Sequence, residues 1–128
     1  MIAYDLIGQT PLVLLESFSD ENVKIYAKLE QFNPGGSVKD RLGKYLVETA
    51  IEDGRLKEGG TIVEATAGNT GIGLAIAANR FRVKCVIFAP EGFSEEKISI
   101  MKALGADVRR TPKAVSYTHL RAHETRHD

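Results

Sequence analysis

The chain has 128 residues, of which 43% are hydrophobic and 27% charged, a composition typical of one small globular domain. Its 17 basic and 17 acidic side chains balance, so no charge excess favours nucleic acid or an anionic membrane as a partner. No apolar run approaches the ~20 residues of a transmembrane helix, and residues 1–5 do not resemble a signal peptide. The only cysteine, Cys85, cannot form an internal disulfide, and a reducing, cytoplasmic compartment is expected.

The N-terminal part of the chain predicts two short strands. Residues 11–15 form a short apolar run after a turn signal, and residues 23–29 alternate apolar and basic side chains as a half-buried strand does. Four turn residues at 33–36 then end this extended region.

A helix is predicted after the turn. Ser37 is a suitable N-cap, and Asp40 lies three residues further on, as the acidic member of a capping box would. Apolar and small side chains recur at helical spacing over residues 42–50, and Gly54 is a plausible stop.

From residue 61 onward, strands and helices alternate. The predicted elements are a strand at 61–65, a helix at 72–79, a strand at 83–88, a helix between Ser94 and Gly105, and a strand at 107–111. This order implies βαβ units with right-handed crossovers, and hence an α/β fold with a parallel sheet.

The turn at Thr66–Gly71 lies between a predicted strand and a predicted helix. Its small residues allow backbone N–H groups to approach an anion closely, and its hydroxyl and amide groups add further donors. A carboxylate or a phosphate would suit such a site. The alternative is a tight βα turn with an Asx-type cap at Asn69.

Lys39 is placed in the first turn of the predicted helix, where the helix dipole disfavours a cation. A lysine that forms a Schiff base gives up its free ammonium and becomes part of a cofactor site, which would explain the position. The alternative is a solvated helix lysine.

These two segments together resemble a known family. Asn-Pro-Gly-Gly-Ser-Val-Lys-Asp-Arg at 33–41 and Glu-Ala-Thr-Ala-Gly-Asn-Thr-Gly at 64–71 are closely similar to the cysteine synthase and cystathionine β-synthase family. Residues 7–12 and 28–30 also match, and the resemblance covers residues 4 to about 113. It implies a fold type II pyridoxal-phosphate enzyme with the three-layer αβα architecture of tryptophan synthase β. The fold would be truncated here, because family members are much longer.

The resemblance also implies roles for individual residues. Pyridoxal 5'-phosphate would be the cofactor, attached to Lys39, and Lys39 would also move the α-proton of the substrate. Asn69 would contact the ring hydroxyl oxygen of the cofactor. The substrate carboxylate would be bound by Thr66, Ala67, Gly68, Asn69 and Thr70. No metal is expected in this site.

The family reaction implied is β-replacement, in which O-acetylserine and sulfide give cysteine and acetate. Ala67 stands where the family usually has Ser, and this form resembles a bacterial branch that accepts homocysteine, so a cystathionine β-synthase activity is the alternative. A remote alternative is a nicotinamide-dependent dehydrogenase, but the glycines at 68–73 have the spacing G-x-x-G-x-G and not G-x-G-x-x-G. The expected partners are small molecules, with a homodimer for the full-length enzyme.

The resemblance further suggests how the chain is organised. Residues 1–36 would be strands of the large domain, residues 37–113 part of a small βα domain, and residues 114–128 a non-native tail that looks like translated sequencing adapter. His119, His123 and His127 in this tail have a spacing that could bind Zn²⁺ on one helix face, but a metal there would be adventitious. The segments that bind the cofactor phosphate and the pyridine nitrogen would lie beyond this chain, so the chain alone is expected to be inactive.

Overall fold

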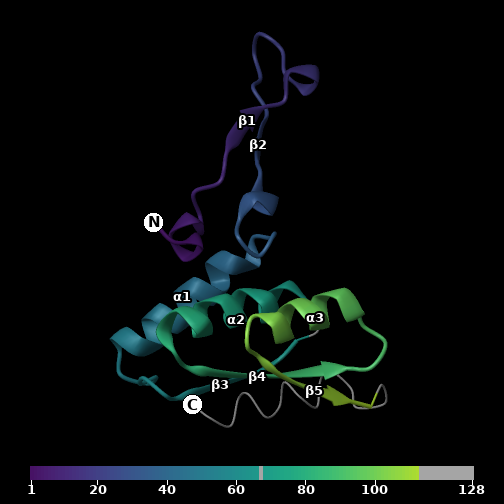
Figure 1. Ribbon diagram of the computed structural model, residues 1–128. Helices are drawn as coiled ribbons and strands as arrows, with labels where there is room; N and C mark the ends of the chain where they lie inside the picture. The colour runs from purple at the N-terminus through teal and green to yellow at the C-terminus, as the bar shows by residue number, and fades with distance from the viewer. Residues whose placement is uncertain (67, 113–128) are drawn as a thin grey trace.

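The computed structural model describes residues 1–66 and 68–112, which form two small sheets and three α-helices (Figure 1). The larger sheet is parallel, with the strand order β3 (Thr61–Ala65), β4 (Lys84–Pro90) and β5 (Asp107–Thr111). Helix α2 (Asn69–Phe81) connects β3 to β4, and α3 (Glu95–Ala103) connects β4 to β5. The predicted parallel βαβ arrangement is therefore confirmed.

In the part of the chain that the structure describes, the helices lie on one side of the parallel sheet (Figure 1). The core lies between the sheet and these helices, where Ile87 of β4 and Ile98 and Met101 of α3 are fully buried. Helix α2, which was predicted from its small and apolar side chains, has seven buried residues. Its side chains are small because the helix packs on two sides. One side faces the sheet, and the other faces α1 (Lys39–Glu52).

Helices α1 and α2 touch through their backbones at two glycines. A Cβ atom at Gly43 would lie 2.3 Å from the carbonyl carbon of Gly73, and a Cβ at Gly73 would lie 2.4 Å from the carbonyl oxygen of Lys39. Only glycine permits this approach, because any side chain would overlap the opposing backbone. The contact therefore fixes the start of α1 against α2.

The N-terminal segment contains short elements: η1 (Ala3–Leu6), β1 (Leu12–Leu14), η2 (Glu16–Phe18), β2 (Tyr26–Lys28) and η3 (Glu30–Phe32). Strands β1 and β2 pair antiparallel and project away from the helices (Figure 1). The predicted half-buried strand at 23–29 is shorter than expected, and Val23, Ile25 and Tyr26 are exposed. The strand is confirmed over residues 26–28, and the predicted burial of its apolar side is wrong because the hairpin projects away from the helices (Figure 1).

The capping box predicted at the start of α1 is not formed. The helix begins at Lys39 with Val38 as its N-cap, and Ser37 Oγ accepts a hydrogen bond from the N–H of Lys39 at 3.1 Å. The Asp40 carboxylate accepts from the N–H of Gly35 and not from that of Ser37. Asp40 is fully buried, so its side chain turns inward and does not cap the helix at the surface.

Three signals for helix ends agree with the structure. Ser94 Oγ caps α3 by accepting from the N–H of Lys97 at 3.3 Å. Gly54 and Gly105 end their helices with φ angles of +81° and +91°, as C′ glycines do. Helix α2 is longer than the predicted 72–79, because it begins at Asn69. The division at residue 36 remains a prediction, and residues 114–128 lie outside the described residues.

Candidate functional site

The loop after β3 lies at the carboxyl end of the parallel sheet. Thr66 is fastened to the neighbouring strand, because its N–H donates to the carbonyl oxygen of Phe88 at 3.1 Å. Thr66 Oγ1 in turn accepts from the N–H of Gly68 at 3.3 Å, and Gly68 is the N-cap of α2. Ala67 lies outside the described residues. The described loop residues are thus held at the edge where ligands bind in parallel α/β sheets.

Asn69 and Thr70 are the first two residues of α2. Their backbone N–H groups have no acceptor in the described part of the chain, as is usual at a helix N-terminus. The Asx-type cap considered as an alternative is not formed, because Asn69 lies inside the helix and the cap has no side-chain hydrogen bond. The N-terminus of α2 therefore presents backbone donors and the positive end of its dipole, which suit a carboxylate.

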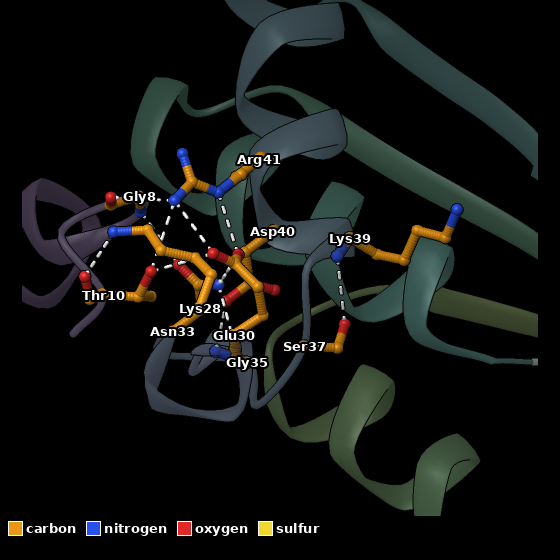
Figure 2. Close-up of polar contacts among 10 residues, drawn as sticks. All are labelled: Gly8, Thr10, Lys28, Glu30, Asn33, Gly35, Ser37, Lys39, Asp40 and Arg41. Carbon is orange, nitrogen blue, oxygen red and sulfur yellow. Dashed lines mark hydrogen bonds and ion pairs between the residues drawn. The ribbon is translucent and has the colours of Figure 1, made fainter. Parts of the chain in front are cut away.

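Lys39 combines a fixed backbone with a free side chain. Its N–H is bonded to Ser37, and its carbonyl oxygen lies against Gly73 of α2. Its side chain is exposed and points away from the neighbouring polar cluster (Figure 2). No described residue forms an ion pair or a hydrogen bond with its ammonium group. An accessible amine on a rigid backbone fits covalent attachment to an aldehyde cofactor.

The helix contact brings the two predicted site segments together. Gly73, which touches the Lys39 carbonyl, is four residues after Asn69, so Lys39 lies about one helical turn, ~6 Å along α2, from the donors at its N-terminus. Periodicity in the sequence does not reveal this contact. The only available signal was the pair of glycines within the two predicted helices.

The residue after Lys39 in α1 carries a buried carboxyl group. Asp40 has no exposed surface, and its Oδ1 has no hydrogen-bond partner in the described structure. Burial raises the pKa of this carboxyl, and the hydrogen bond from the Gly35 N–H partly opposes that effect. A Cβ at Gly35 would lie 2.3 Å from Asp40 Oδ1, so the Gly35 position admits no side chain.

The described residues show no sign of a metal site or a membrane-spanning segment. Within residues 1–66 and 68–112, no three His, Cys, Asp or Glu side chains converge as metal ligands would. None of the helices in the same ranges is both long and apolar enough to cross a bilayer. The spacing His119, His123 and His127 falls outside the described residues.

Known proteins with this arrangement identify its family. The family model for "Pyridoxal-phosphate dependent enzyme" matches residues 3–127. The chain is 54% identical over 110 residues to an O-acetylserine dependent cystathionine beta-synthase of Bacillus subtilis, covering 85% of this chain and 36% of that protein. It is 49% identical over 114 residues to a cysteine synthase of Helicobacter pylori, covering 84% of this chain and 36% of that protein. The chain therefore belongs to the family of pyridoxal-phosphate dependent enzymes.

A solved structure agrees with this assignment. The crystal structure of a cysteine synthase from Entamoeba histolytica superposes with a TM-score of 0.87 at 39% identity, over 98% of this chain and 39% of that one. The fold is thus that of the fold type II pyridoxal-phosphate enzymes, and the nicotinamide alternative is set aside. The chain spans about a third of the length of these relatives. For the experiments below, the "completed enzyme" is the full-length protein that contains this chain.

Asp40 predicts a pH dependence of stability in the completed enzyme. Because its pKa is raised on folding, the carboxyl favours the folded state while protonated, below the ~4 of an unfolded aspartate. This contribution is lost as the pH rises through the raised pKa. Between pH 4 and pH 8, the free energy of unfolding should therefore fall more steeply for the parent protein than for Asp40→Asn. Urea unfolding of both proteins measures the difference, and parallel curves would contradict the prediction.

Proposed function

We propose that the protein containing this chain catalyses β-replacement on O-acetylserine, with sulfide as the nucleophile and cysteine and acetate as the products. One observation carries the proposal: the backbone of Lys39, whose side chain is exposed, packs against α2 about one turn from the N-terminal donors of that helix, in a chain of a pyridoxal-phosphate family. The relatives described above support the choice of O-acetylserine, because one of them is named for its dependence on that substrate.

Each residue of the proposed site has a separate role. Lys39 would hold the cofactor covalently until the substrate amine displaces it, and its freed Nζ would then take the proton from the substrate Cα and later return it. The hydroxyls and N–H groups of residues 66–70 bind the substrate carboxylate, which leaves Cβ oriented for loss of acetate and formation of the new C–S bond. Asn69 donates from its side-chain amide to the cofactor ring oxygen. Pyridoxal phosphate, when bound, supplies an electron sink for the charge that develops at Cα.

Homocysteine is a second candidate nucleophile, and its product would be cystathionine. Ala67 favours it, because the family usually has Ser at this position and the Ala form resembles a bacterial branch that accepts homocysteine. The Bacillus subtilis relative, which is named a cystathionine beta-synthase, also favours it. A homodimeric assembly, which rests on the family resemblance, and a cytoplasmic location, which rests on the single cysteine, belong to the same proposal.

The proposal is tested by supplying the completed enzyme with pyridoxal phosphate and O-acetylserine, then sulfide or homocysteine in turn. Mass spectrometry of the products should show cysteine in the first case, and cystathionine in the second if the alternative holds. Residues 1–128 alone should form neither product and should bind the cofactor weakly, because a phosphate needs a nest of backbone donors that the described residues do not complete. Cofactor-loaded completed enzyme that forms neither product would refute the proposal.

A further inference from the structure

A cluster of polar groups joins the N-terminal segment to the first turn of α1, on the side of the helix that faces away from Lys39 (Figure 2). The proposed reaction does not use it. We call it the Glu30–Arg41 cluster, and it consists of Gly8, Thr10, Lys28, Glu30, Asn33 and Arg41.

The centre of the cluster is a two-pronged ion pair. Arg41 Nε donates to Glu30 Oε2 at 2.8 Å, and Arg41 Nη2 donates to Glu30 Oε1 at 2.9 Å. The second nitrogen also donates to the carbonyl oxygen of Gly8 at 2.9 Å, and Thr10 Oγ1 donates to Glu30 Oε1 at 2.8 Å. The Glu30 side chain is only 20% exposed. The Arg41 hydrogen bond is the main reason that the pKa of Glu30 falls to about 2.

Asn33 connects this pair to the turn before α1. The residue is 3% exposed. Its Nδ2 donates to both the carbonyl oxygen and the Oε2 of Glu30, at 2.9 and 2.8 Å, and its Oδ1 accepts from the N–H of Gly8 at 2.8 Å. Its carbonyl oxygen accepts from the N–H of Gly36 at 2.8 Å, within the turn itself. Glu30 therefore holds the turn from both ends, through Asn33 before it and Arg41 after it.

Three consecutive residues at the start of α1 have different surroundings. Lys39 points away from the cluster and is exposed, Asp40 is buried, and Arg41 binds the cluster (Figure 2). Successive helical residues are rotated by ~100°, so anchoring Arg41 and burying Asp40 fix the direction in which Lys39 leaves the helix.

We propose that the Glu30–Arg41 cluster is a positioning device for Lys39. The inference rests on the proposed function, in which Lys39 carries the cofactor and moves the α-proton. The cluster touches neither cofactor nor substrate, and it acts by holding the 34–38 turn and the first turn of α1 in one orientation. Proton transfer depends steeply on geometry, and a misplacement of ~1 Å can cost ~10²-fold in rate. Loosening the cluster should thus slow the reaction without weakening substrate binding.

The test replaces Glu30 by Gln in the completed enzyme. Gln keeps the shape but loses the charge, and it places an NH₂ group against donors of Arg41 or Asn33. We expect kcat to fall about 10–100-fold with KM changed by less than about 3-fold. The pH at which the absorbance band of the bound cofactor is half-changed should differ from that of the parent enzyme. Borohydride reduction should label Lys39 at a different rate. Arg41→Lys, which keeps the charge but loses the two-pronged geometry, should give the same result.

The matched control is Asp53→Asn at the other end of α1. Arg55 Nε contacts both carboxylate oxygens of Asp53, at 2.9 and 2.8 Å, so this variant also removes a two-contact ion pair, but one far from Lys39 along the helix. It should leave kcat, the absorbance band and the labelling rate unchanged. A Glu30→Gln enzyme that loses thermal stability yet keeps all three properties would show that the cluster is only structural, and would overturn the inference.

Two further measurements keep the test decisive. If Glu30→Gln does not fold, Thr10→Val removes one hydrogen bond to Glu30 at nearly constant volume, and it should change the pH midpoint and kcat in the same direction by a smaller factor. Unchanged values in Thr10→Val would then overturn the inference. Mapping the borohydride-labelled lysine in the unmodified completed enzyme separates the two proposals: a label on a residue other than Lys39 refutes the proposed role of Lys39 before any variant is made.

Discussion

The completed enzyme with Lys39→Ala should lack the covalently held cofactor and should lose β-replacement activity by at least ~10²–10⁴-fold, the usual contribution of a positioned acid–base group. The physical reason is that the α1–α2 contact holds the Lys39 backbone about one turn from the α2 donors, and that among the described residues no carboxylate pairs with its ammonium group. Absorbance of the bound cofactor, borohydride reduction followed by peptide mapping, and product formation are the three measurements.

Lys44→Ala is the matched control for this variant. Lys44 belongs to the same helix, but its Nζ lies over the Tyr4 ring, 5.1 Å from the ring centroid, and not toward the candidate site. The control should keep the cofactor band and most of the activity. Recovery of the pyridoxyl group on any lysine other than Lys39, or full activity in Lys39→Ala, would refute the assignment.

Gly73→Ala should destabilise the completed enzyme by about 1–3 kcal/mol, the usual range for overpacking. Alanine normally stabilises a helix relative to glycine by ~1 kcal/mol, so a loss would reverse the ordinary sign. The new Cβ would lie 2.4 Å from the Lys39 carbonyl oxygen, and α1 would have to move away from α2. Because Lys39 moves with α1, the pH midpoint of the cofactor band should change together with the midpoint of urea unfolding.

Ser99→Ala on the exposed side of α3 is the control, since it makes a similarly small change in a helix without a backbone contact. It should leave both the unfolding midpoint and the cofactor band almost unchanged. If Gly73→Ala proves as stable as the parent protein, the close approach of the two helices is not a constraint on the position of Lys39.

The type and order of the elements between residues 61 and 111 could be predicted from the sequence, with end points that differ by up to three residues. Their signals are local: the strand at 107–111 is a short polar and β-branched run, and Ser94 and Gly105 mark the ends of α3 by chemistry that acts within a few residues. The exposure of the 23–29 strand could not be predicted, because burial depends on what packs against a strand and not on its own alternation.

The candidate site was predictable only in part. The resemblance indicated Lys39 and residues 66–70, and the structure supplies the contact that brings Lys39 near Asn69. The capping-box spacing predicted the wrong hydrogen-bond donor for the Asp40 carboxylate. A capping box and an inward-facing carboxyl have the same spacing in sequence, and in the structure the donor is the N–H of Gly35. The contacts of Glu30 with Arg41, eleven residues apart, depend on the fold of the intervening turn, and no short-range pattern indicates them.

The different surroundings of Lys39, Asp40 and Arg41 limit how this segment can vary in length. Inserting one residue within α1 between Arg41 and Gly43 would rotate Lys39, Asp40 and Arg41 by ~100° about the helix axis, relative to the fixed contact of Gly43 with α2. Lys39, Asp40 and Arg41 would then each face surroundings that suit a different side chain. A single insertion would therefore disturb all three contacts at once. The number of residues from Lys39 to Gly43 is therefore fixed by the helix geometry.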